Sequence, residues 1–496
     1  MLRSIFLSLF LFLPFNTYAS PDVSQAALSR VKEQVIKETL DNGLRVLIYP
    51  RPVAPVFAGV VTVHLGGVDE HIGNTGGSHL LEHMAFKGTE SIGTTDYSQE
   101  KKLLTQLENL LGDGRQVSEL SEKEKETLKS LYEQLNKVWK TDELSRIFRA
   151  IGGVGLNATT AKEMTNYFVN LPRTAFEHWC WLESERLLNP VMRQFYKERD
   201  VVLEERRMRY VDDPGGRLYE AMLGTAYLSH PYRNPVIGYE FDVSTLTVSD
   251  VEDLHHQYYV PNNMVISLVG DIDPVKAMPL IRKYFGRLPV RPYPVHPRQK
   301  EEEQDGERRV IIRDDSEPQV GIAYKKPNYP DPDDPVLGVL SEILTGGRTS
   351  ALYKELVEKK KLTTSFSAFE APDNGYPNLL FFYGDVRSPH TPEEVLKGFD
   401  QAIHSFIQRG PTDEEMQIAK RAMSMSYLTE LQSNMSMARG LASSELAHGS
   451  WKASFDWYEQ MLKVTREDVQ RAAEQYLVPE RRTVGFVKPE RKRKEA

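Results

Sequence analysis

The first part of the chain has runs of β-branched and other apolar residues that predict β-strands. Asn42-Gly43 interrupts one such stretch at residues 39–48, and Val56 to Leu65 forms another. An Asn-Gly pair between strand-like runs is the strongest short signal for a β-hairpin. We therefore predict a hairpin at 39–48 and a further strand at 56–65.

The periodicity then changes from that of a strand to that of a helix. A glycine-bearing loop, Gly73 to Gly77, precedes apolar positions at Leu80, Leu81, Met84 and Phe86. Ser78 stands where a side-chain oxygen often caps a helix N-terminus. The HLLEH sequence at 79–83 is therefore predicted to lie on a helix capped by Ser78.

Residues 97–152 form a charged stretch without proline, in which leucines recur at helical spacing on both sides of Gly112-Asp113-Gly114. This pattern predicts two antiparallel helices inserted into the first domain. Two interpretations of their exposed faces stay open: a plain solvated hairpin, or a gate or docking surface for a partner.

A proline-rich and acidic stretch at 286–306 predicts a linker between two domains. After it, strands are expected at 310–313 and 320–324. A helix is expected at 336–344, followed by a Gly346-Gly347 break and a second helix at 350–359. This order echoes the first half, so we predict an α+β protein made by duplication, with domains at 20–285 and 307–487. The basic tail, 488–496, is predicted to be disordered.

Composition limits the class of protein further. A chain of 496 residues with 40% hydrophobic content can build more than one core. The net charge of −8, with both signs interspersed, argues against nucleic acid as a partner. The single cysteine, Cys180, excludes an intrachain disulfide.

The first 19 residues have the features of a secretory signal peptide. Arg3 precedes an apolar run from Ile5 to Leu13, and Ala19 ends a segment that suits cleavage. No later apolar run is long enough to span a bilayer. The cleavage site is not followed by a cysteine to which a lipid anchor could be attached. We expect an exported protein without a stable membrane anchor, located in the periplasm of a Gram-negative bacterium.

The predicted HLLEH helix can carry metal chemistry. His79 and His83 are four residues apart, so both can direct a ring nitrogen toward one zinc ion. Glu82 places a carboxylate beside the same ion, where it can deprotonate a water molecule and later protonate a leaving amine.

A catalytic zinc needs a third protein ligand, and the segment 197–206 offers three glutamates. Glu198 and Glu205 are seven apart and share a helix face, whereas Glu204 points about 100° away from Glu205. One of the aligned pair can bind zinc while the other holds a ligand histidine. The residues alone leave open which does which, and an ordinary charged helix is the alternative.

Three segments resemble the pitrilysin, or inverzincin, metallopeptidases. They are GGSHLLEHMAFKGT around His79, LNATTAKEMTNYF at 156–168 and ERDVVLEE at 198–205. That family includes insulin-degrading enzyme and the β subunit of mitochondrial processing peptidase, and the chain is most similar to bacterial members of the processing-peptidase type. The resemblance implies two homologous α/β-sandwich domains that form half of a clamshell.

The resemblance also implies roles for individual residues. One Zn²⁺ per chain would be bound by His79, His83 and Glu205, with Glu82 as general base and Glu198 supporting a ligand histidine. A strand matching 155–159 would pair with an extended peptide or polypeptide substrate through the backbone of Asn157 and Ala158. The implied activity is that of a zinc-dependent endopeptidase acting on unfolded or short peptides.

The chain departs from the family pattern in two ways. The interval from His83 to Glu205 is long, and the insert at 97–152 accounts for the excess. In addition, the second half has no Arg seven residues before a Tyr, a pair with which self-sufficient relatives grip substrate. We therefore expect that a homologous metal-free subunit or a second copy completes the site. The alternative is a non-catalytic or partner-dependent assembly subunit, although such copies usually lose a ligand or the base.

Overall fold

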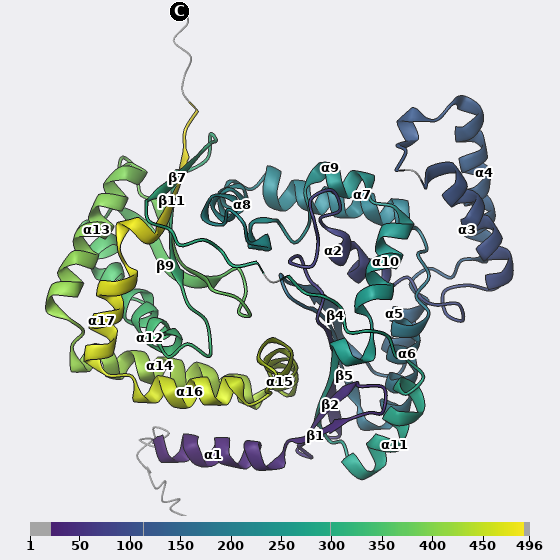
Figure 1. The fold of residues 1–496 in the computed structure, drawn as a ribbon, viewed down its shortest axis with the longest axis horizontal. Coiled ribbons are helices and arrows are strands. Elements are labelled where there is room, and N and C mark those ends of the chain that lie inside the picture. The colour runs from purple at the N-terminus through teal and green to yellow at the C-terminus, as the bar shows by residue number, and fades with distance from the viewer. Residues whose placement is uncertain (1–20, 113, 298, 491–496) are drawn as a thin grey trace, which may run out of the picture.

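The computed structural model describes residues 21–112, 114–297 and 299–490. The predicted signal peptide and most of the predicted tail lie outside the described residues. Two β-sheets, each covered by helices, form two halves that follow one another along the chain (Figure 1). The α+β fold class is confirmed. Within the described residues, every helix is too short or too polar to cross a membrane.

The first sheet has six strands in the order β1-β2-β6-β3-β5-β4. Strands β1 and β2 form the predicted hairpin, and Gly43 in its turn has a φ of 91°, which favours glycine. The strands are β1 (Ile36–Thr39), β2 (Arg45–Pro50), β3 (Val56–Val63), β4 (Val154–Thr160), β5 (Thr165–Pro172) and β6 (Met264–Gly270).

The second sheet repeats this topology with five strands in the order β7-β11-β8-β10-β9. In both sheets the first and last strands of the repeat are parallel neighbours and the remaining pairs are antiparallel. The duplication inferred from the sequence is thus present in the strand order. The strands are β7 (Arg308–Arg313), β8 (Gln319–Lys326), β9 (Thr363–Ala371), β10 (Asn378–Val386) and β11 (Arg482–Lys488).

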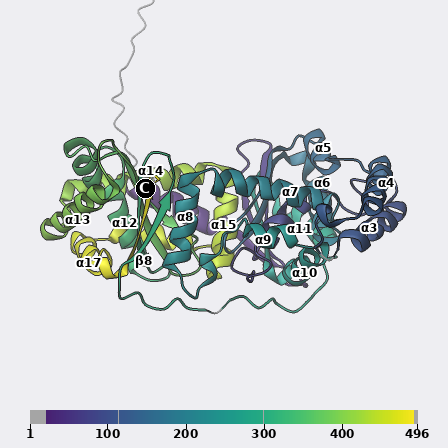
Figure 2. The same ribbon diagram turned by 90° about the horizontal axis from the view of Figure 1, so that it is seen from above.

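Helices of the first half cover the first sheet and form the insert. The insert contains the two predicted helices, α3 and α4, which pack side by side at the end of the molecule farthest from the second half, and an additional helix, α5 (Figures 1 and 2). The helices are α1 (Pro21–Gln34), α2 (Gly77–Met84), α3 (Tyr97–Leu111), α4 (Glu122–Val138), α5 (Glu143–Ala150), α6 (Phe176–Leu188), α7 (Phe195–Arg206), α8 (Pro214–Ala226), α9 (Glu240–Thr245), α10 (Val248–Tyr258) and α11 (Pro274–Phe285).

The predicted linker lies between α11 and β7, and it runs along one edge of the molecule from the first half to the second (Figure 2). Beyond it, the second half has its own set of helices. These are α12 (Asp333–Thr345), α13 (Pro392–Arg409), α14 (Asp413–Gln432), α15 (Asn434–His448), α16 (Ala453–Lys463) and α17 (Arg466–Tyr476), with a π-helical segment at Tyr353–Lys359.

Helices of each half pack against the other half. Helix α8 of the first half packs on the second sheet, where Leu218 and Met222 share a core with Phe381. Helix α15 of the second half packs on β3 and β6 of the first sheet. A Cβ atom on Gly485 of β11 would lie 2.6 Å from the Met222 sulfur, so a larger residue would force this side chain of α8 to shift. The hydrophobic cores are therefore shared between the halves.

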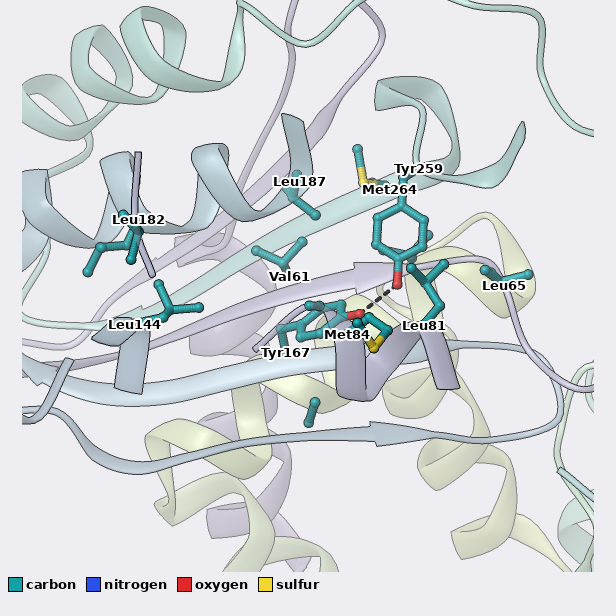
Figure 3. Close-up of a cluster of buried hydrophobic side chains, with 14 of the residues drawn as sticks. Val61, Leu65, Leu81, Met84, Leu144, Tyr167, Leu182, Leu187, Tyr259 and Met264 are labelled. Carbon is teal, nitrogen blue, oxygen red and sulfur yellow. Dashed lines mark hydrogen bonds between the residues drawn. The ribbon is translucent and has the colours of Figure 1, made fainter. Parts of the chain in front are cut away.

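The apolar face of α2 is anchored in the core of the first half. Leu81 and Met84 are fully buried beside Tyr167 of β5 and Tyr259, whose hydroxyl groups lie 2.6 Å apart in a hydrogen bond (Figure 3). Burial of such side chains contributes about 1.5–3 kcal/mol each. This packing fixes which face of α2 points away from the core.

Candidate metal centre

The N-terminus of α2 is held differently from the sequence-based expectation. Gly76, with a φ of 90°, occupies the N-cap position, and the side chain of Ser78 makes no cap. Instead, the buried Glu70 carboxylate accepts hydrogen bonds from the backbone N–H groups of Gly76 and Ser78 at 2.8 and 2.6 Å. Burial raises the pKa of Glu70 to about 7, and the two N–H donors offset only part of that effect. The predicted Ser78 cap is wrong because a carboxylate from the preceding loop takes its place.

Three predicted ligand residues converge where α2 packs against α7. One nitrogen each of His79 and His83 and one oxygen of Glu205 lie within 4.8 Å of one another. Glu205 Oε2 is 3.8 Å from His79 Nε2 and 3.7 Å from His83 Nε2. In the described part of the chain, no other cluster of His, Cys, Asp or Glu side chains meets this criterion.

This donor set fits zinc. Two imidazole nitrogens and one carboxylate oxygen are a common ligand set of catalytic zinc sites, which keep a fourth position open. Burial, with smaller contributions from His83 and Arg209, lowers the pKa of His79 to about 3. The ring is therefore neutral at neutral pH, and the neutral ring is the form that binds a metal.

Glu198 contacts His83 from the other side of the imidazole ring. Its Oε2 lies 3.4 Å from His83 Nδ1, and Lys87 Nζ donates to its Oε1 at 2.5 Å. Burial alone would raise the pKa of Glu198, but the hydrogen bonds from His83 and Lys87 outweigh it, and the net shift is downward. Glu204 instead pairs with Arg207 at the surface, where both side chains are 53% exposed.

Glu82 lies on the same helix with its carboxylate directed toward β4. Thr160 Oγ1, at the end of that strand, donates to Glu82 Oε2 at 2.5 Å. Burial raises the pKa of Glu82, and the Thr160 hydrogen bond and the nearby His83 counteract this shift. The hydroxyl group thus fixes the orientation of the carboxylate.

Strand β4 is an edge strand. It pairs with β5 on one side only, with Asn157 opposite Phe168 and Ala158 opposite Tyr167. Its other edge has no strand partner among the described residues. Asn157 is exposed and Ala158 is buried, so the two side chains occupy opposite faces of the strand.

Sequence reasoning missed four residues that support the centre: Glu70, Lys87, Thr160 and Arg209. Lys87 continues the four-residue spacing of His79 and His83, and Arg209 lies four residues after Glu205, so spacing could have identified both. Arg209 Nη2 is 2.8 Å from Glu205 Oε1, in the π-helical segment Arg207–Val211 that follows α7. Glu70 and Thr160 reach the centre only through the tertiary fold.

A His-x-x-Glu-His helix that faces a glutamate-bearing helix, on one of two equivalent halves, is the arrangement of inverted-motif metallopeptidases. Two family models match the chain: insulinase (peptidase family M16) at residues 45–122 and the peptidase M16 inactive domain at residues 245–423. The chain belongs to the insulinase family, peptidase family M16.

Known proteins are similar over nearly the whole chain. The zinc protease PqqE of Helicobacter pylori is 28% identical over 460 residues, which cover 91% of this chain and 92% of that protein. The crystal structure of a protease from Helicobacter pylori has a TM-score of 0.78 and 26% identity, covering 92% of this chain and 99% of that chain. The periplasmic protease PqqL from Escherichia coli has a TM-score of 0.69 and 19% identity, covering 92% of this chain but 48% of that chain. The fold described above therefore corresponds to half of that longer protein.

Proposed function

We propose that this chain is a zinc-dependent endopeptidase that hydrolyses unfolded or short peptides. The observation that carries the proposal is the convergence of His79, His83 and Glu205 next to Glu82. The similarity to named zinc proteases supports the same conclusion.

His79, His83 and Glu205 would hold one Zn²⁺. When bound, the ion supplies a Lewis acid that polarises the scissile carbonyl group and lowers the pKa of water. Glu82 accepts a proton from the attacking water and later donates it to the leaving amine. Thr160 orients the Glu82 carboxylate, and Glu198 orients the ring of His83.

Substrate would bind as an additional strand along the free edge of β4. The backbone groups of Asn157 and Ala158 would pair with an extended peptide, and main-chain pairing of this kind tolerates many side chains. Because Thr160 belongs to the same strand and touches Glu82, a peptide on this edge would pass close to the base.

The match to an inactive domain does not count against activity. That model covers residues 245–423, whereas His79, Glu82 and His83 fall within residues 45–122, which match the insulinase model. The alternative is an assembly subunit without catalysis. Loss of a metal ligand or of the base would support it, but this chain retains both.

We further propose that the active form contains two chains of this fold. The fold corresponds to half of a longer protease, and the expected Arg and Tyr pair is absent from the second half. A homologous metal-free subunit or a second copy would complete the chamber. Export to the periplasm, directed by residues 1–19, is part of the same proposal.

The test is zinc-dependent hydrolysis of a quenched, unstructured peptide by the mature chain, with Glu82→Gln as the matched control. We expect both proteins to bind one zinc and only the wild type to cleave. The assay is run over a range of protein concentrations because a second copy forms the chamber only above the dimer dissociation constant. A zinc-loaded wild type that stays inactive throughout that range would favour the assembly subunit or a requirement for a different chain.

A further inference from the structure

A cavity lined by aromatic side chains lies between α8 and the second sheet. Its volume is about 430 Å³, within the usual range of roughly 300–1,000 Å³ for ligand pockets. Tyr219 of α8, Phe369 of β9 and Phe381 of β10 form its ring-lined wall. The cavity therefore includes residues from both halves of the chain.

This cavity adjoins a second cavity that lies next to the candidate metal centre. The second cavity, of about 240 Å³, is lined by the ligand residue His79 and by Thr160. The two cavities share three lining residues: Arg209, Tyr210 and Tyr219. A peptide lying at the metal centre could thus place a side chain into the aromatic cavity.

Two charged groups at the cavity are already engaged within the protein. Arg209 pairs with Glu205, and Asp213 accepts hydrogen bonds from the backbone N–H groups of Gly215 and Gly216. In contrast, Phe369 is 43% exposed although it is aromatic. The surface left for a ligand is mainly apolar.

We propose that this cavity binds an aromatic side chain of the peptide at a fixed position relative to the scissile bond. The ring centroids of Phe369 and Phe381 are 5.0 Å apart, and that of Tyr219 lies 6.4 and 5.8 Å from them, in stacked and tilted pairs. A further ring extends this cluster with favourable contacts between ring faces and edges, which an aliphatic chain lacks. The proposal rests on the proposed endopeptidase function and specifies its substrate class.

The glycines of α8 provide both a blocking variant and its control. A Cβ on Gly215 would have its nearest neighbours at 3.5 Å, and the residue lines the cavity, so Gly215→Phe can fill it. Gly224 lies on the same helix with nothing within 4 Å of an added Cβ, so Gly224→Phe adds the same bulk outside the cavity. Phe369→Ala removes part of the wall from an exposed position and guards against misfolding of the blocked variant.

The first experiment compares kcat/KM for peptides that differ only by Phe or Ala at one position, scanned through the sequence. We expect one position at which Phe exceeds Ala by at least about tenfold, as apolar pockets commonly discriminate. Gly215→Phe and Phe369→Ala should each reduce that ratio at least threefold, and Gly224→Phe should leave it unchanged. A ratio that neither cavity variant alters would overturn the proposal and leave the peptidase function intact.

A second experiment separates the cavity from catalysis. Zinc-loaded Glu82→Gln is titrated with the same Phe and Ala peptides, and binding is measured directly. Tighter binding of the Phe peptide that disappears on adding Gly215→Phe supports the cavity even if the wild type cleaves nothing. Equal affinities for the two peptides would refute it whatever the outcome of the hydrolysis assay.

Discussion

Replacing the three glutamates of α7 by glutamine, one at a time, should affect zinc affinity to different extents. Glu205 faces the Nε2 atoms of both His79 and His83, whereas Glu198 faces only the Nδ1 atom of His83. Glu204 pairs with Arg207 at the surface and has no contact with either histidine. We expect the largest loss for Glu205→Gln, a smaller one for Glu198→Gln and none for Glu204→Gln.

The magnitudes follow from what each substitution removes. Residues that orient a ligand histidine typically contribute about 10–100-fold to metal affinity, which is about 1.4–2.7 kcal/mol. Glu198→Gln keeps an acceptor for His83 but loses the charge that faces Lys87, so it belongs in this range. Glu205→Gln removes a ligand itself and leaves Arg209 without its carboxylate partner, so its loss should exceed about a hundredfold. The Glu204–Arg207 pair is exposed and screened by solvent, so its loss should leave the metal centre unaffected.

Zinc affinity is measured by competition with a chromophoric chelator at constant pH, after circular dichroism shows that each variant is folded. Equal losses for Glu204→Gln and Glu205→Gln would mean that α7 is an ordinary charged helix. A larger loss for Glu198→Gln than for Glu205→Gln would exchange the roles of these two carboxylates. Either result would refute the assignment of the third ligand.

Three further predictions concern residues around the ligands. Thr160→Val should lower kcat/KM about ten- to a hundredfold at full zinc content, because a hydrogen bond to a charged group contributes about 1.5–3 kcal/mol. Thr159→Val, on the opposite face of the strand, is the control, and equal effects of the two substitutions would contradict the role of Thr160. Burial raises the pKa of Glu70 from 4.5 to about 7, so its contribution to stability is complete below pH 4.5 and is lost as the pH rises toward 7, by up to about 3 kcal/mol. Glu70→Gln should therefore weaken the dependence of the urea unfolding midpoint on pH between pH 5 and 8. An unchanged pH dependence would show that another group causes it. A chelator should lower the melting temperature of the zinc-loaded wild type, since a ligand at a thousand times its Kd stabilises by about 4 kcal/mol, but should not change that of His83→Ala.

The ligand helices could be predicted because their information is local. The four-residue spacing of His79 and His83 and the seven-residue spacing of Glu198 and Glu205 determine which side chains share a helix face. Both segments are helical as predicted, and α2 and α7 pack against each other. The resemblance to a known family assigned Glu205 as the ligand, and the distances now place Glu205, but not Glu198, facing both Nε2 atoms.

Two of the supporting residues, Glu70 and Thr160, could not be predicted in this way because their contacts are set by the tertiary fold. The start of α2 depends on the left-handed backbone of Gly76 and on a carboxylate from the preceding loop, so the local preference for Ser78 as a cap was misleading. Thr160 meets Glu82 only because β4 passes beside α2. No periodic pattern in the sequence encodes either contact.

The packing of α8 on the second sheet explains how a half without metal ligands can influence the centre. Helix α7 carries Glu205, the π-helical segment after it carries Arg209, and α8 follows within a few residues. Because α8 is seated on β8 and β11 through Gly321 and Gly485, the second sheet positions the chain segment that leaves the metal centre. The same seating forms the aromatic cavity, since α8 supplies one wall and β9 and β10 supply the other. The second half therefore has a structural reason to be retained in the same chain: it shapes the surface that a bound peptide would meet next to the ligands.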